Sequence, residues 1–338
     1  MNMTYKELLD NARECMKPHC MACPECNGRA CGNMLPGPGA KGSGDGAIRN
    51  YEVWKEIRVN MDTIHETFEP DTSFDFFGMK MKYPLFAGPV GAVNMHYGDK
   101  YNDMQYNDIL VRACADAGIA AFTGDGMYPE VMVAASAAIR KCGGVGIPTV
   151  KPWDEDTLSE KFELVEQSGC SVVAMDIDAA GLPFLQNMDP PAGAKSVDEL
   201  ARIVKMAKRP FIVKGIMTVA GAVKAREAGA AGIVVSNHGG RVLDQCAATA
   251  EVLPEIAEAV PELMILVDGG IRSGVDVFKA LAMGANAVVI ARPYVTAVYG
   301  GADEGVKLYT DKIGGELADA MKMCGASDLS KIKRNMIC

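Results

Sequence analysis

The side chains best suited to chemistry follow one short apolar run. Residues Ile233–Val235 are β-branched, a composition typical of a buried strand. Ser236, Asn237, His238 and Arg241 come directly after it. In parallel α/β folds, sites are built at the carboxyl ends of strands. A histidine and an arginine three residues apart at such an end predict a proton acceptor beside an anion-binding cation.

His238 is one of only four histidines in the chain, and two glycines follow it. Gly239 and Gly240 should let the backbone turn sharply and approach a ligand closely. A histidine buried in the core is the ordinary alternative, but a glycine-flanked loop offers little core. The pattern therefore favours a functional role for His238.

Five cysteines form a second group of reactive side chains near the N-terminus. Cys20, Cys23 and Cys26 match the first three positions of the bacterial run that binds iron–sulfur clusters, and Cys31 follows one residue later than the fourth position of that run. We predict that these four cysteines bind a metal ion or a cluster. Cys15 is the fifth member of the group.

Two other interpretations of the cysteines stay open. Zinc bound by four of these thiols, or by some of them together with His19, is one. A cysteine-rich segment without metal is the other, although the density of thiols speaks against it. The sequence does not decide between an iron–sulfur cluster and zinc.

Composition limits the class of protein. The chain has 338 residues, 49% of them hydrophobic, with 36 glycines and a net charge of −9. This size allows one large barrel or two ordinary domains, and the negative charge argues against binding to nucleic acid. No apolar run reaches the roughly 18 residues of a membrane helix, and the N-terminus lacks an apolar signal core. We therefore expect a cytoplasmic protein whose 11 cysteines are free thiols or metal ligands.

Glycines mark a repeating pattern of helices and strands. At Gly118, Gly169, Gly229 and Gly284 a helical stretch ends and an apolar strand follows at once. The strands predicted in this way, or from apolar runs alone, are Pro84–Ala87, Ile119–Thr123, Gly144–Ile147, Val172–Ile177, Phe211–Lys214, Gly232–Ser236, Met264–Asp268 and Ala287–Ala291. Eight alternating units predict an α/β fold, a (β/α)8 TIM barrel, over residues 61–338.

An N-terminal extension, residues 1–60, precedes the predicted barrel. Helices are expected at 4–14 and 48–61, with a loop rich in glycine and proline at 32–46. Within the barrel, the polar residues at the predicted strand ends are Thr123, Asp125, Thr149, Asp176, Asp178, Lys214, Ser236, Asn237, His238, Asp268 and Arg292. Such a concentration at one end of a barrel predicts an active site there.

The stretch from Ser236 to Asp244 resembles the signature of the FMN-dependent 2-hydroxy acid oxidases and dehydrogenases, the relatives of glycolate oxidase, lactate oxidase and mandelate dehydrogenase. The similarity extends to Phe211–Gly215, Asp268–Arg272 and Ala291–Pro293. It is close from 209 to 332, loose from 42 to 178, and absent before that. The cysteine segment lies outside it.

The resemblance implies roles for four residues. His238 would take the hydroxyl proton of a 2-hydroxy acid while hydride moves to flavin N5, and Asp178 would hydrogen-bond this histidine. Lys214 would lie near flavin N1 and O2, and Arg241 would bind the substrate carboxylate. Asp178 as an ordinary salt-bridge partner, and Lys214 as part of an ordinary ion pair, are the alternatives.

The same resemblance implies an FMN site and a homo-oligomer, with a homotetramer as the family pattern. The residues that it assigns to FMN are Ala87, Gly88, Pro89, Thr123, Lys214, Ser236, Asp268, Gly269, Gly270, Arg272, Ala291 and Arg292. Glycine-rich turns near the last two strands would hold the phosphate.

Three departures from the family concern the substrate. One tyrosine of the family is replaced near Ala40 and a second near Thr149, and an arginine is missing from 179–185. The main hypothesis is therefore oxidation of a 2-hydroxy acid or a related alcohol. The alternatives are a redox-neutral isomerase, as in the type 2 isopentenyl diphosphate isomerases, and an electron-transfer flavoprotein that docks to a redox carrier through its cysteine segment.

Overall fold

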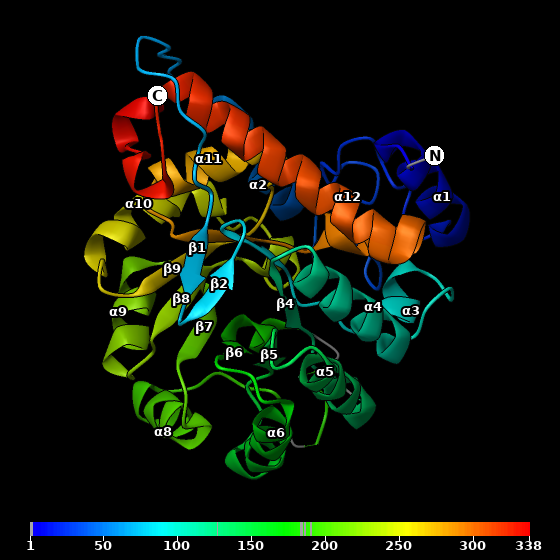
Figure 1. Cartoon of the computed structure of the whole chain (residues 1–338). Helices are drawn as coiled ribbons and strands as arrows, with labels where there is room; N and C mark the ends of the chain where they lie inside the picture. Colours follow the sequence, from blue (N-terminus) through cyan, green and yellow to red (C-terminus); the bar gives the residue numbers. More distant parts are fainter. Residues whose placement is uncertain (1–2, 127, 183–184, 186, 190) are drawn as a thin grey trace.

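The barrel predicted from the glycine pattern is confirmed by a computed structural model, which describes residues 3–126, 128–182, 185, 187–189 and 191–338 (Figure 1). Eight parallel strands close in the order β10-β3-β4-β5-β6-β7-β8-β9. Their bounds are β3 Leu85–Ala87, β4 Ala120–Thr123, β5 Ile147–Val150, β6 Val173–Asp176, β7 Phe211–Ile216, β8 Gly232–Val235, β9 Met264–Val267 and β10 Ala287–Ile290. An antiparallel hairpin, β1 Phe74–Phe76 and β2 Met79–Met81, precedes the barrel.

Helices surround the strands (Figure 1). The described α-helices are α1 Tyr5–Met16, α2 Asp45–Glu56, α3 Val93–Tyr97, α4 Asp103–Asp116, α5 Pro129–Lys141, α6 Glu155–Ser168, α8 Val197–Ala207, α9 Val219–Glu227, α10 Thr249–Ala259, α11 Gly274–Ala282 and α12 Arg292–Cys324. Short 3-10 helices are η1 Ile177–Gly181, η2 His238–Gly240, η3 Leu329–Lys331 and η4 Arg334–Met336. None of the helices in these described ranges has the length and hydropathy needed to cross a bilayer.

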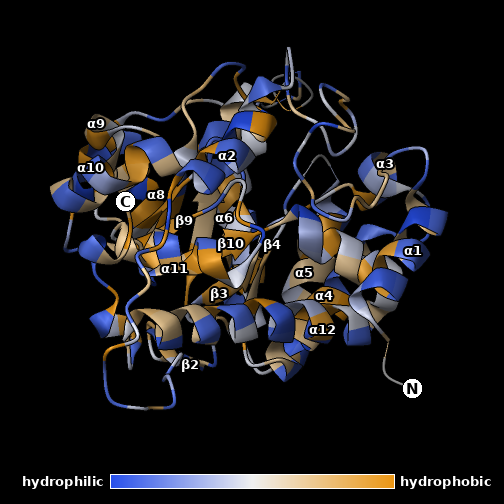
Figure 2. Cartoon of the chain, turned by 90° about the horizontal axis from the view of Figure 1, so that it is seen from above, coloured by the Kyte–Doolittle hydropathy of each residue, from blue (hydrophilic) through white to orange (hydrophobic). Residues whose placement is uncertain are grey.

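The core fills the barrel and the space between its strands and helices. The four residues of β8 are all buried, as are those of β4, β6 and β10. A strand that is buried on both faces has a continuous apolar sequence. These strands could therefore be predicted from the sequence. Figure 2 shows the hydrophobic residues gathered on the strands in the middle of the molecule.

The four glycine joints predicted from the sequence are confirmed. Gly118, Gly169, Gly229 and Gly284 have φ values of 76°, 72°, 87° and 102°. This left-handed conformation ends a helix at little steric cost only when the residue is glycine. Each helix therefore stops where the following strand must begin.

The third barrel strand lies later in the chain than predicted. Its predicted bounds were Gly144–Ile147, but β5 runs from Ile147 to Val150. Gly143, Gly144 and Gly146 all have positive φ, so they form the joint before the strand. The shift moves the carboxyl end of β5 to Val150 and brings the next residue to the mouth of the barrel.

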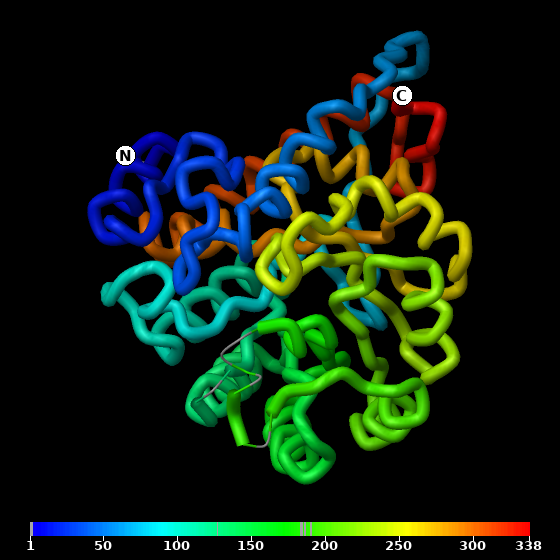
Figure 3. Tube along the Cα trace, turned by 180° about the vertical axis from the view of Figure 1, so that it is seen from behind, coloured from blue at the N-terminus to red at the C-terminus, as the bar shows by residue number. Residues whose placement is uncertain are grey.

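The N-terminal extension packs on the barrel. Helix α1 lies along α12 (Figures 1 and 3), where a side chain on Gly300 would come within 2.2 Å of the Leu8 carbonyl oxygen. Helix α2, predicted at 48–61, begins earlier, at Asp45. It also ends earlier, at Glu56, because the backbone of Ile57 is already extended. The Trp54 indole of α2 donates a hydrogen bond to the Gly269 carbonyl at 2.8 Å.

Candidate active site

A cavity of about 140 Å³ opens at the carboxyl ends of the strands. Several residues predicted from the sequence line it, namely Pro89, Lys214, His238, Arg241, Asp268, Gly269, Gly270, Arg272, Ala291 and Arg292. Lys214 lies within β7, and the others follow the carboxyl ends of β3, β8, β9 and β10. The prediction of one concentrated site at this end of the barrel is therefore consistent with the geometry.

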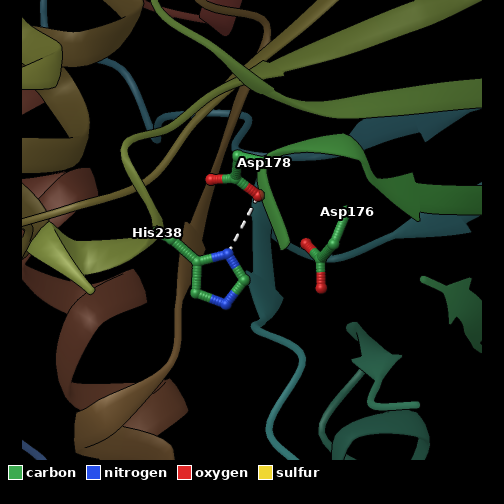
Figure 4. A group of neighbouring side chains, drawn as sticks. All are labelled: Asp176, Asp178 and His238. Atoms are coloured by element: carbon green, nitrogen blue, oxygen red, sulfur yellow. Dashed lines mark hydrogen bonds and ion pairs between the residues drawn. The ribbon is translucent and has the colours of Figure 1, made fainter. Parts of the chain in front are cut away.

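His238 and Asp178 form a hydrogen-bonded pair at the cavity (Figure 4). Nδ1 of His238 lies 2.9 Å from Oδ1 of Asp178, and the two side chains are only 15% and 10% exposed. A carboxylate on Nδ1 fixes the proton on that nitrogen. Nε2, which points away from Asp178 in Figure 4, is then the nitrogen able to accept a proton.

The loop that carries His238 is held in an unusual conformation. His238 itself has a φ of 56°, in the left-handed region that side chains seldom adopt. The Asn237 carboxamide exchanges two hydrogen bonds with that of Asn50 on α2, at 2.7 and 3.0 Å, and the Ser236 hydroxyl accepts the His238 N–H at 3.1 Å. The extension thus contributes to orienting the histidine.

The two glycines after His238 pack closely on other parts of the protein. A Cβ on Gly240 would lie 2.7 Å from the Ala47 backbone nitrogen of α2, and one on Gly239 would lie 3.0 Å from Arg292. Gly239 also lines the cavity, and close approach of a ligand to these glycines stays a prediction.

Buried charges surround Lys214 at the base of the cavity. Its Nζ lies 3.0 Å from Asp176 and 3.4 Å from Asp268, and Lys151 Nζ lies 2.6 Å from the other Asp176 oxygen. Burial lowers the pKa of Lys214, but these carboxylates and Asp178 raise it overall. Burial likewise opposes ionisation of Asp176, yet Lys151 and Lys214 hold its pKa below the ordinary value. Both groups are therefore charged at neutral pH.

Four buried side-chain oxygens in this region have no hydrogen-bond partner within the described part of the chain: Thr123 Oγ1, Asp178 Oδ2, Asp268 Oδ1 and Asp176 Oδ1, the last of which is ion-paired with Lys214. Burial raises the pKa of Asp268, although Lys214 acts to lower it. Unpaired buried oxygens are costly in a folded protein. Asp268 lines the cavity, so a bound polar group there would complete the hydrogen bonding of its carboxylate.

Lys151 is the main site residue that the sequence did not reveal. It follows β5 directly, so the misplaced strand end hid it. It lines the cavity, and its backbone N–H donates to Asp125, whose carboxylate also accepts from Trp153 and Lys161. Thr149, which we had placed near a missing tyrosine, is fully buried in the strand. Positions 183 and 184, within the segment that lacks the arginine, lie outside the described residues.

The three arginines of the site are engaged by backbone carbonyls. Arg241 donates to Gly37 and Gly39 of the extension, and Arg292 donates to Gly239. Arg272 donates to the Cys26 carbonyl at 2.6 Å. Burial lowers the pKa of Arg241 to about 10, which leaves it charged at neutral pH. Because a guanidinium has five N–H donors, each arginine keeps donors for a ligand.

The remaining predicted residues lie behind the cavity surface. The Gly88 N–H donates to the Ile290 carbonyl, and a Cβ there would meet that of Ala291 at 2.9 Å. Ala87 is buried in β3, and Ser236 is buried below His238. These residues shape the cavity wall and do not form its lining.

The four predicted metal ligands meet at a second cavity, of about 380 Å³. Cys20, Cys23, Cys26 and Cys31 all line it, whereas Cys15 does not. Burial raises the pKa of the Cys20 thiol to about 12. His19, the alternative ligand, is not among the lining residues either.

Comparison with known proteins places this geometry in a family. The sequence pattern of the FMN-dependent dehydrogenases matches residues 38–189 and 184–338. The chain belongs to the FMN-dependent dehydrogenase family. It is 42% identical to peroxisomal (S)-2-hydroxy-acid oxidase GLO4 of Oryza sativa subsp. japonica over 151 residues, 44% of this chain but only 40% of that enzyme. It is 28% identical to the 4-hydroxymandelate oxidase of Amycolatopsis orientalis over 90% of this chain and 95% of that one.

Solved structures agree with this membership. A mandelate oxidase bound to (S)-2-phenylpropionate superposes with a TM-score of 0.78 at 26% identity, covering 98% of both chains. A lactate oxidase of Pediococcus acidilactici has a TM-score of 0.80 at 23% identity, over 99% of this chain and 94% of that one. This second likeness shows the shared barrel fold.

Proposed function

We propose that this protein is an FMN-dependent oxidoreductase that converts a 2-hydroxy acid to a 2-oxo acid. The observation that carries the proposal is the His238–Asp178 pair, which lies 2.9 Å apart at the mouth of a family barrel and beside the buried Lys214. Asp268 Oδ1, which has no hydrogen-bond partner in the described residues, belongs to a residue that lines the cavity and fits a bound polar group. When bound, FMN supplies the hydride acceptor.

Each residue of the pair has a defined task in this proposal. His238 accepts the substrate hydroxyl proton at Nε2, and Asp178 holds the proton on Nδ1 and stabilises the positive imidazolium that results. Lys214 places a fixed positive charge where the flavin gains negative charge on reduction. Arg272 and Arg292, with Gly269 and Gly270, supply donors for the phosphate.

The substrate carboxylate would be held by Arg241 and Lys151. Both side chains line the cavity and are charged, and Lys151 keeps two of its three ammonium donors after pairing with Asp176. Lys151 thus supplies a cation in a site that lacks the second arginine of the family. A small 2-hydroxy acid with one carboxylate fits this arrangement.

The test is anaerobic reduction of the FMN-loaded protein by glycolate, lactate and mandelate, followed as loss of flavin absorbance. We expect bleaching with at least one of them and recovery of the corresponding 2-oxo acid. Failure to bind FMN, or no bleaching with any 2-hydroxy acid tried, contradicts the proposal. Turnover of a substrate with no electron acceptor present would instead indicate the isomerase alternative.

Further features of the protein follow as part of the same proposal. We propose residues 1–60 as a cofactor-bearing extension of an FMN-binding barrel, residues 61–338. A cytoplasmic location suits the 11 cysteines, all of them free thiols. A homo-oligomer is the assembly that the family relationship favours.

A further inference from the structure

The four cysteines of the extension line one cavity although none of them lies on a helix or a strand. They lie in the irregular segment between α1 and α2, and all four line one cavity of about 380 Å³. One water molecule needs only about 15 Å³ of such cavity volume, so this cavity has room for a much larger group. The bacterial cluster-binding run takes its fourth ligand from elsewhere in the chain. Here Cys31 brings the fourth sulfur to the same cavity.

Two of the four sulfurs, those of Cys20 and Cys26, accept hydrogen bonds of the kind that support bound thiolates. The Ala22 N–H donates to Cys20 Sγ at 3.5 Å, and the Arg272 guanidinium donates to Cys26 Sγ at 3.8 Å. Hydrogen bonds to cysteine sulfur stabilise negative charge on an iron–sulfur cluster. Cys31 donates its S–H to the Gly28 carbonyl at 3.6 Å, and Cys15, outside the cavity, donates its own to backbone carbonyls of α1 and to that of Tyr299.

One zinc ion and a four-iron cluster hold four thiolates at different separations. Four thiolates around one zinc lie about 3.8 Å apart, given a Zn–S distance of about 2.3 Å and tetrahedral angles. Among the described residues, one group of three or more histidine, cysteine, aspartate or glutamate side chains has its ligand atoms within 4.8 Å of one another: Asp176, Asp178 and His238. In this group Asp176 pairs with lysines, and Asp178 pairs with His238. No three cysteine sulfurs of the described residues therefore lie as close together as one zinc ion would hold them. A cluster binds each thiolate through a different iron atom and holds them farther apart.

We propose that Cys20, Cys23, Cys26 and Cys31 bind an iron–sulfur cluster of the four-iron type in this cavity. The flavin cavity lies next to it, because Tyr97, Arg272 and Arg292 line both. The cluster site is thus one side-chain layer from the end of the FMN site assigned to phosphate.

The position of this site defines a route for electrons, and this part of the inference rests on the proposed function. Oxidation of one 2-hydroxy acid yields one 2-oxo acid, two electrons and two protons. With a cluster bound by these cysteines, the electrons would leave singly through this site and reduce two molecules of a one-electron carrier protein, while the protons would go to solvent. Pro24 and Glu25, between Cys23 and Cys26, are exposed, so a carrier can approach this turn.

Metal content tests the site itself. Wild-type protein and the variants Cys23→Ser, Cys31→Ser and Cys15→Ser are purified anaerobically, reconstituted with iron and sulfide, and assayed for iron, sulfide and FMN, with electron paramagnetic resonance after dithionite reduction. We expect about four irons and about four sulfides per chain in wild type and Cys15→Ser, and loss of both in the other two variants with FMN retained. Stoichiometric zinc in place of iron, no metal, or equal loss in Cys15→Ser overturns the proposal.

Electron transfer tests the route. With a 2-hydroxy acid as donor, Cys23→Ser should reduce cytochrome c roughly tenfold more slowly than wild type or worse, after correction for its own rate of flavin bleaching. An unchanged rate with cytochrome c overturns the route. If no 2-hydroxy acid bleaches the wild-type flavin, the proposed function fails, whereas the iron and sulfide result still decides the cluster site.

Discussion

Replacing Asp178 with asparagine isolates the electrostatic contribution of the carboxylate, because the two side chains have the same shape. Asp178 and His238 are nearly buried, with Oδ1 2.9 Å from Nδ1. Two unit charges about 4 Å apart interact by about 4 kcal/mol at an effective dielectric constant of about 20. A proton half-transferred to His238 would feel roughly half of this energy. The expected loss is therefore about 2 to 4 kcal/mol, or roughly 30- to 1,000-fold in the rate of flavin reduction.

The assay is single-turnover reduction of the bound flavin, with rapid anaerobic mixing and saturating substrate. FMN content serves as the control for correct folding. Because Asp178 acts through the histidine, the double variant Asp178→Asn/His238→Ala should be no slower than His238→Ala alone. A rate for Asp178→Asn within about threefold of wild type, or losses that add in the double variant, would refute the reasoning.

Three further predictions concern buried groups of the site. Lys151→Met should raise KM about 10- to 150-fold with a smaller change in kcat, since it removes a charged hydrogen bond worth about 1.5 to 3 kcal/mol; steady-state kinetics with an unchanged KM would contradict this. Asp176→Asn leaves buried ammonium groups unpaired and should cost about 3 to 5 kcal/mol in urea unfolding; an unchanged midpoint would contradict that cost. Gly270→Ala places a Cβ 1.9 Å from the Asn50 carbonyl oxygen, so its Tm should fall and FMN should dissociate more readily, whereas Gly315→Ala, with open space around it, should leave both unchanged.

The fold could be predicted from the sequence because its signals are local. Continuous apolar runs mark strands that are buried on both faces, and glycines such as Gly169 mark the helix ends. The failure at β5 is also local, because Gly144 and Gly146 precede the strand and do not belong to it. That error of three residues concealed Lys151.

The site was only partly predictable, because some of its contacts join distant parts of the chain. Asn50 and Asn237 are 187 residues apart in sequence, and neither periodicity nor residue type indicates that their carboxamides meet. The same holds for Arg241, which the family relationship directs to substrate but which also donates to carbonyls of the glycine-rich loop. Pairing of such groups is set by tertiary packing, which a motif does not encode.

The docking of the extension also bears on the order of assembly. Cys26 leaves the ribosome long before Arg272, its partner 246 residues later, a delay of about 10 to 50 seconds at ordinary rates of synthesis. The surface of α12 that receives α1 is made later still. The thiols therefore remain solvent-accessible throughout translation. Metal insertion is therefore possible before the flavin site closes, while the thiols are still exposed.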